Sequence, residues 1–334
     1  MLRGMILFAV VSVVLIWLGG IGAYAGKEAL GKFAPLVMIP VMVVPLIMAY
    51  VAHRFTGAVG NPFRGLVWGN TSWYFAAWLL GLLCGGVVVV IALGLKFAGW
   101  DMTMRDYIAF VVAQSEQPGE SIPESARGAL SIGGWVTAFG APTFGAWLGG
   151  AVGCLSTFPW FGWFYRRLLV YGRGVALWVL LILTALAGAS AGLIENPQFG
   201  NTSIALRVAV MAFGSLAAVP AVLWIFLRTR SAVVPALAQA SYSAALAASM
   251  PFLSDSNPVL APPAGAVVGI GVLLVGMALW LWKDPGGKEL AVAAVAYDGT
   301  PLTPEDVAGL KKSEGSSATP TAAQSTEAPP PSTP

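Results

Sequence analysis

The 334-residue chain has little charge: Lys, Arg, Asp and Glu make up only 10% of its residues. Typical soluble domains carry about 25%. Apolar residues make up 57% of the chain, and they come in long uninterrupted runs. So few charges cannot cover the surface of a soluble fold of this length. The shortage of charge therefore excludes an ordinary soluble enzyme and predicts a protein whose surface faces lipid.

Residue types that bind metals are also scarce, with one histidine, His53, and two cysteines, Cys84 and Cys154. A metal site needs several converging His, Cys, Asp or Glu side chains. Both cysteines lie in apolar runs, where cysteine behaves as a small hydrophobe. Zinc, phosphate-loop and nucleophile-elbow patterns are missing from the sequence. We expect no metal site, no cofactor and no disulfide, and we expect His53 at the membrane interface beside Arg54.

Long apolar runs dominate the sequence instead, and a membrane-spanning helix needs about 20 such residues. The candidate spans are residues 5–24, 35–52, 73–95, 131–157, 175–194, 208–226, 232–250 and 264–282. The first run ends in the small-residue pattern Ala23-Tyr24-Ala25, which secretory signals also show. Because the run is longer than a signal core, we expect it to be retained. The sequence predicts an all-α membrane protein, a polytopic bundle of about eight transmembrane helices.

Charge is distributed unevenly between the loops. The loops after the second, fourth and sixth runs carry only basic charges, from Arg54, Arg64, Arg166, Arg167, Arg173, Arg228 and Arg230. Residues 99–130 instead carry five acidic residues and two arginines. Basic residues gather in short cytoplasmic loops. We therefore expect both termini in the cytoplasm and the bundle in the plasma membrane, with the lipid bilayer as its partner and no nucleic acid.

Composition changes near the C-terminus. We expect the transmembrane bundle to cover residues 1–283 and a cytoplasmic segment to cover residues 284–312, with one short helix from Thr303 to Lys312. Residues 313–334 are mostly Ser, Thr, Ala, Pro and Gly. Such a tail cannot bury enough apolar surface to fold and is predicted to be disordered.

The segment Pro159–Arg173 combines aromatic residues with three arginines between two apolar runs. One interpretation is an interfacial aromatic belt beside positive charges on the cytoplasmic side. The other is a guanidinium held inside the bundle, where it orients a carboxylate or a carbonyl. The sequence leaves both interpretations open.

Three pieces, in residues 161–169, 191–197 and 228–243, keep the outline of a Glu-Glu-x-x-x-Arg motif, a His-x-Pro motif, and a Thr-Gly-Ser-like turn followed by His-x-x-x-Asn. Their order and spacing resemble the CPBP family of intramembrane endopeptidases, named for CAAX prenyl proteases and bacteriocin-processing enzymes, over about residues 35–250. The family's functional positions are filled here by Phe161, Gly162, Arg166, Glu195, Gln239 and Ser243.

The resemblance implies a site whose chemistry has changed, because glutamates and histidines activate water and stabilise the oxyanion in that family. Phe161 and Gly162 cannot titrate, as a general base must. Gln239 can donate a hydrogen bond to an oxyanion but cannot relay a proton. If the site persists, Arg166, Glu195 and Gln239 are expected to line one intramembrane cavity.

Three functions follow as alternatives. The first is a catalytically silent family member that acts as a membrane scaffold or as the binding partner of a membrane protein or peptide. The second is an active endopeptidase that uses displaced groups, with Glu195 as base and Arg166 and Gln239 polarising the carbonyl. The third is an unrelated transporter or envelope-assembly component.

Overall fold

The computed structural model describes residues 2–26, 38–56, 61–63, 68–115, 124–193, 202–257, 259–262 and 265–282. Six helices in this part of the chain are long and apolar enough to cross a membrane: Leu2–Ala25, Thr71–Gly94, Gly128–Tyr171, Arg173–Leu193, Ile204–Thr229 and Val233–Phe252. Two shorter apolar helices are Pro40–Phe55 and Ala266–Trp282. The chain is a helical membrane protein, as predicted, whereas eight crossings and cytoplasmic termini stay predictions. The predicted helix and disordered tail near the C-terminus lie outside the described residues.

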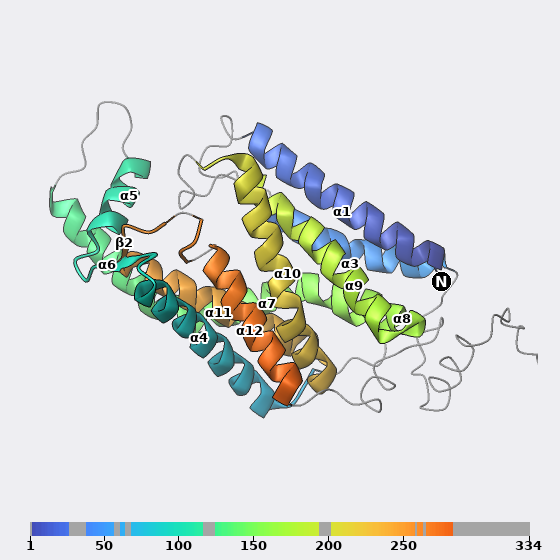
Figure 1. Ribbon diagram of the computed structural model, residues 1–334. Coiled ribbons are helices and arrows are strands. Elements are labelled where there is room, and N and C mark those ends of the chain that lie inside the picture. Colours follow the sequence, from blue (N-terminus) through green and yellow to red (C-terminus); the bar gives the residue numbers. More distant parts are fainter. Residues whose placement is uncertain are drawn as a thin grey trace, which may run out of the picture.

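The α-helices are α1 (Leu2–Ala25), α3 (Met38–Phe55), α4 (Thr71–Gly94), α5 (Arg105–Ser115), α6 (Glu124–Gly140), α7 (Ala146–Thr157), α8 (Arg166–Leu168), α9 (Arg173–Ala189), α10 (Ile204–Thr229), α11 (Val233–Ser249) and α12 (Ala266–Trp282) (Figure 1). Two π-helical segments are η2 (Ala141–Gly145) and η3 (Phe158–Tyr165). Three 3₁₀ segments are η4 (Leu169–Tyr171), η5 (Ser190–Leu193) and η7 (Met250–Phe252). Strands β1 (Gly99–Trp100) and β2 (Leu253–Ser254) form one short antiparallel pair.

The helices pack in two groups that α10 joins. In one group, α1 packs against both α3 and α9; in the other, α4 packs against both α11 and α12 (Figure 1). Helix α10 contacts α9 as well as α11 and α12. These helices are apolar on all sides. One face of each packs on neighbouring helices, and apolar residues on the other face, such as Leu83 and Val90, remain exposed. That pattern is expected of helices surrounded by lipid.

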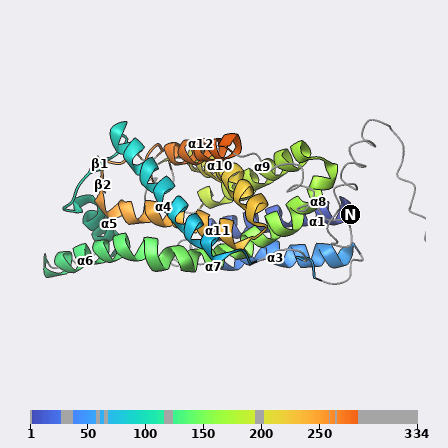
Figure 2. The ribbon, with the colours of Figure 1, turned by 90° about the horizontal axis from the view of Figure 1, so that it is seen from below.

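Helices α6, α7 and α8 follow one another along one edge of the molecule with η2 and η3 between them (Figure 2). The helix therefore continues past residue 157, the predicted end of a span, as far as Tyr171. Pro142 and Pro159 lie near the starts of the two π-helical segments. Proline has no N–H for the regular helical bond, and a wider turn accommodates it without ending the helix.

The continuous apolar helix Gly128–Tyr171 contains 44 residues. At 1.5 Å per residue it is about 66 Å long, roughly twice the thickness of a bilayer's hydrocarbon core. It must therefore be strongly tilted or extend beyond that core. This length separates α6, which packs on η7 next to the strand pair, from η3, which packs against α1 and α3.

Arginines gather at one end of the bundle. Arg166 lies close enough to Arg230 for their charges to repel, and the Arg173 guanidinium lies 4.5 Å over the Trp280 ring near the end of α12. The first turn of α1 reaches the same end, because Gly4 packs against Thr56. The described arginines at this end, here called the basic end, are Arg3, Arg54, Arg166, Arg167, Arg173, Arg228 and Arg230. The described chain places no acidic residue there, which agrees with the uneven loop charges of the sequence.

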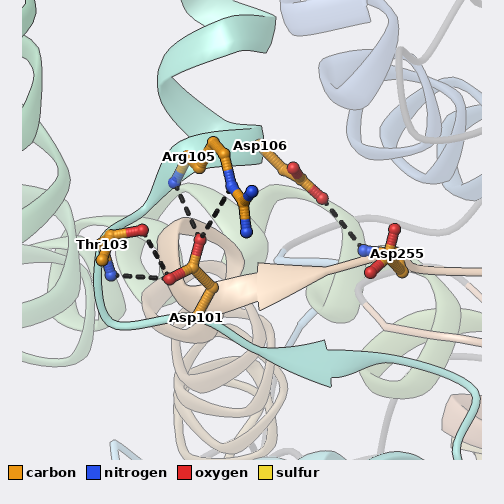
Figure 3. A network of polar contacts seen from close by, with 5 residues as sticks. All are labelled: Asp101, Thr103, Arg105, Asp106 and Asp255. Carbon is orange, nitrogen blue, oxygen red and sulfur yellow. Dashed lines mark hydrogen bonds and ion pairs between the residues drawn. The ribbon is translucent and has the colours of Figure 1, made fainter.

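The opposite end carries a small acidic cap (Figure 3). The Asp101 carboxylate accepts hydrogen bonds from the Thr103 amide (2.8 Å), the Thr103 hydroxyl (2.6 Å) and the Arg105 amide (3.2 Å). Asp106 accepts one from the Asp255 amide at 3.0 Å. These bonds begin α5 and tie it to the segment after β2. The stretch expected to be a loop, residues 99–130, thus contains a strand, helix α5 and the first turns of α6.

We expect Asp101→Ala to release the start of α5, because it removes the acceptor of three hydrogen bonds. The pKa of Asp101 lies below its ordinary value, chiefly because the Thr103 hydroxyl stabilises the carboxylate. Its stabilising contribution is therefore present above about pH 4 and is lost as the pH falls through the lowered pKa. Hydrogen exchange of the amides of residues 101–108, corrected for the intrinsic pH dependence, measures both effects.

Asp106→Ala is the matched control for the acidic cap. It removes the acceptor for the Asp255 amide and should leave the Thr103 and Arg105 amides protected. Unchanged protection of these two amides in Asp101→Ala would contradict the assigned role of Asp101.

Candidate functional site

The aromatic and basic segment predicted at a membrane boundary is buried inside the bundle. Every residue from Pro159 to Leu168 is buried, including Trp163 at 1% exposure and Arg166 and Arg167 at 3% each. The Phe8 ring of α1 packs against it, with centroid distances of 4.9 to 5.2 Å to the rings of residues 160, 163 and 164. The interpretation as a lipid-facing aromatic belt is therefore wrong, because these rings face other helices.

Arg167 is held by groups of the protein. Its Nη1 donates to the Trp163 carbonyl at 3.1 Å, and its Cζ lies 4.6 Å over the Trp163 ring. Its Nη2 lies 3.3 Å from Nδ1 of His53, a buried residue of α3 with 1% exposure. Arginine is always a donor, so Nδ1 accepts this bond and the neutral ring carries its proton on Nε2. Arg167 fits the interpretation of a guanidinium that holds a carbonyl inside the bundle. His53 is buried against it, and its position at the membrane interface stays a prediction.

Phe161 and Gly162, at the positions where the resembling family has glutamates, are both buried. The Phe161 ring packs against Phe226 of α10 at 6.1 Å between centroids. Neither residue has a group that can gain or lose a proton. Phe161 therefore packs η3 against α10, and Gly162 is buried beside it.

Arg166 and Gln239 do not lie together. The Thr157 hydroxyl donates to the Ala232 carbonyl at 2.9 Å, which fixes the end of α7 beside the start of α11. From this contact the chain runs nine residues on to Arg166, whereas α11 runs seven residues back along α7 to Gln239. At 1.5 Å per residue the two positions are about 24 Å apart along the helix axes. Figure 2 shows α8 beyond the region where α11 and α7 overlap.

Glu195 lies outside the described residues. The helical chain that leads towards it, Arg173–Leu193, contains 21 residues and is about 30 Å long. Its last turn packs on the first turns of α10, where Gly192 meets Val208, away from the basic end. Ser243 is exposed on α11, one turn after Gln239.

Gln239 borders a cavity of about 470 Å³, part of which opens to the surroundings. The cavity lies between α4, α10, α11 and α12, and its wall is apolar. Cys84 lines it, whereas Arg166 does not. The sequence analysis did not predict this cavity. Small residues at helical spacing on α10, such as Ala218 and Ala221, are the feature that could have indicated it.

The turn between α10 and α11 has the local structure that its Thr-x-Ser sequence predicts. The Thr229 hydroxyl accepts from the Ser231 amide at 3.3 Å. The Ser231 hydroxyl accepts from the Val233 amide at 3.2 Å and donates to the Trp68 carbonyl at 2.8 Å. These bonds satisfy backbone groups at a helix start. They position α11 relative to α10.

Chemically, the described residues offer packing surfaces and hydrogen-bond donors. Within them, no group of three or more His, Cys, Asp or Glu residues could hold a metal ion. Both cysteines are free thiols. Comparison of the chain with protein-family models, with curated proteins and with solved structures found no match.

Proposed function

We propose that the chain is a catalytically silent membrane scaffold that keeps the helical bundle of an intramembrane endopeptidase without its chemistry. The observation that carries this proposal is the burial of Phe161 and Gly162 within the bundle. Both lie where the resembling family has its glutamates, and both are buried in helix packing. A phenyl ring at 6.1 Å from Phe226 contributes contact area and no proton transfer.

The surrounding polar groups support a structural role. Arg167 bridges the Trp163 carbonyl and His53, and so joins the continuous helix to α3. A buried charge whose donors are used in this way fixes one arrangement of neighbouring helices. The concentration of arginines at the basic end supports an orientation with that end, and both termini, in the cytoplasm.

An active endopeptidase needs a base and an oxyanion donor within reach of one scissile carbonyl. The separation of Arg166 from Gln239 by about 24 Å opposes such a site. An unrelated transporter stays an alternative, although no described helix carries an acidic residue in its middle. The scaffold proposal accounts for the separation of Arg166 from Gln239 and for the lack of acidic residues in the middle of the described helices. A scaffold needs helices in fixed positions and no converging titratable groups.

We expect the purified protein in lipid vesicles to leave a fluorogenic membrane-spanning peptide uncleaved. The parent, Arg166→Gln and Glu195→Gln should all match protein-free vesicles, because none of these residues performs hydrolysis. The measurement is release of the fluorescent product, with an intramembrane protease of the resembling family as the positive control.

Cleavage by the parent that Glu195→Gln or Arg166→Gln reduces at least tenfold would overturn the scaffold proposal. It would show that the displaced groups converge in a functional state. Circular dichroism and gel filtration of each variant would establish that a loss of cleavage is not a loss of folding.

A further inference from the structure

The apolar cavity between α4, α10, α11 and α12 reaches towards the basic end. Ile225 of α10 and Leu279 of α12 line it. Three residues further along the same helices are Arg228 and Trp282. Residues three apart lie on one face of a helix, separated by about one turn. A rim that combines a guanidinium with an indole therefore lies just beyond the cavity wall.

Aromatic rings build this rim. Trp224 and Trp282 stack with their centroids 6.3 Å apart, and the Arg228 Cζ lies 5.5 Å over the Trp224 ring. On the neighbouring turn, the Trp280 Nε1 donates to a carbonyl of α10 at 2.9 Å. Tryptophans of membrane proteins lie at the headgroup level. The rim is thus placed where phospholipid headgroups begin.

A second guanidinium lies at the basic end, over a different tryptophan. The Arg173 Cζ lies 4.5 Å over the Trp280 ring, and Arg173 comes from α9. Arg228 is therefore the guanidinium of the rim. The planar guanidinium matches the geometry of a phosphate, with which it can form paired hydrogen bonds.

We propose that this cavity binds one acyl chain of an anionic phospholipid whose phosphate lies at Arg228. The wall is apolar, as an acyl chain requires. The cavity is partly open, and Leu80, Cys84 and Val275 in its wall are each partly exposed. Positive charge at the rim selects an anionic headgroup from a mixed bilayer. This proposal goes beyond the scaffold function and holds whether or not the chain cleaves peptides.

Photocrosslinking tests the lipid site directly. The full chain is reconstituted with phosphatidylglycerol or with phosphatidylcholine, each carrying a diazirine near the end of one acyl chain. After illumination, mass spectrometry locates the adducts. We expect adducts within residues 80–84, 218–225 and 272–279. We expect about fivefold more with phosphatidylglycerol, the ratio that about 1 kcal/mol of headgroup attraction gives.

Arg228→Gln should abolish this headgroup preference while the helices still fold. Its matched control is Arg54→Gln: Arg54 also lies over an aromatic ring at the basic end, at 5.4 Å from Tyr50, but its helix, α3, does not line the cavity. The preference should survive in Arg54→Gln. Equal adducts from the two lipids in the parent, or a preference that Arg228→Gln leaves unchanged, would overturn the proposal.

Thiol labelling gives an independent measurement that needs no substitution. Cys84 lines the cavity, whereas Cys154 lies outside it on α7 with its thiol 3.1 Å from the Gly150 carbonyl. N-ethylmaleimide should modify Cys84 several-fold more slowly in phosphatidylglycerol vesicles than in phosphatidylcholine vesicles. Cys154 should react alike in both. An equal effect on both thiols would contradict occupancy of the cavity.

Discussion

Replacing Gly81 by valine is expected to prevent α4 from packing on α11. A Cβ atom at Gly81 would lie 2.4 Å from the Ala238 carbonyl oxygen and 2.9 Å from the Tyr242 backbone nitrogen. Both are backbone atoms of α11, so no side-chain rotation can relieve the contact. Membrane helices associate through such close approaches, because lipid supplies no hydrophobic drive between them. The expected cost is about 3 kcal/mol or more.

Gly86→Val is the matched control on the same helix, because a Cβ there meets nothing within 4 Å. Unfolding by SDS titration in mixed micelles should shift strongly for Gly81→Val. For Gly86→Val the shift should stay within about 0.5 kcal/mol of the parent. If the two variants unfold alike, the contact of α4 with α11 does not have the close packing described here.

The membrane class and the helix positions could be predicted because they depend on local composition. In the part of the chain that the structure describes, each of the eight apolar runs overlaps a helix. An uninterrupted run without charge has no other stable structure in lipid. The turn at Thr229 and Ser231 was also local: its two hydroxyls satisfy backbone groups within a few residues.

The burial of the Pro159–Arg173 segment could not be predicted in the same way. Its tryptophans and arginines are also the composition of a membrane interface. The deciding contacts come from distant parts of the sequence, with Phe8 against Trp163 and His53 against Arg167. No pattern inside the segment specifies either partner.

The candidate site shows the same limit. Spacing along the sequence placed Arg166 and Gln239 in corresponding motifs, but it could not show that α11 runs back along α7, away from Arg166. Glycine pairs are a further example. In Gly85-Gly86, only Gly85 faces α11, where its Cβ would lie 2.5 Å from that of Ala245, whereas Gly86 meets nothing. The sequence shows that two glycines are adjacent, but it does not show which of them packs against α11.

Trp163→Ala is expected to destabilise the group of helices around η3. The indole is 1% exposed, packs against Phe8 at 5.2 Å between centroids, and carries the Arg167 guanidinium at 4.6 Å over its ring. The free energy of transferring the indole from lipid into the bundle contributes little to this cost, because acyl chains are as apolar as the bundle interior. The cost comes from the empty volume and the lost contacts, about 3 kcal/mol.

Trp178→Ala on α9 is the control for this substitution, because it removes the same side chain where 66% of it is exposed. SDS titration should leave its unfolding midpoint near that of the parent. A double-mutant cycle of Trp163→Ala with Phe8→Ala should give a coupling of about 1 kcal/mol between the two rings. Equal loss in the two tryptophan variants would show that Trp163 faces the bilayer. The segment would then be the interfacial belt, and the packing role assigned to Phe161 and Gly162 would lose its basis.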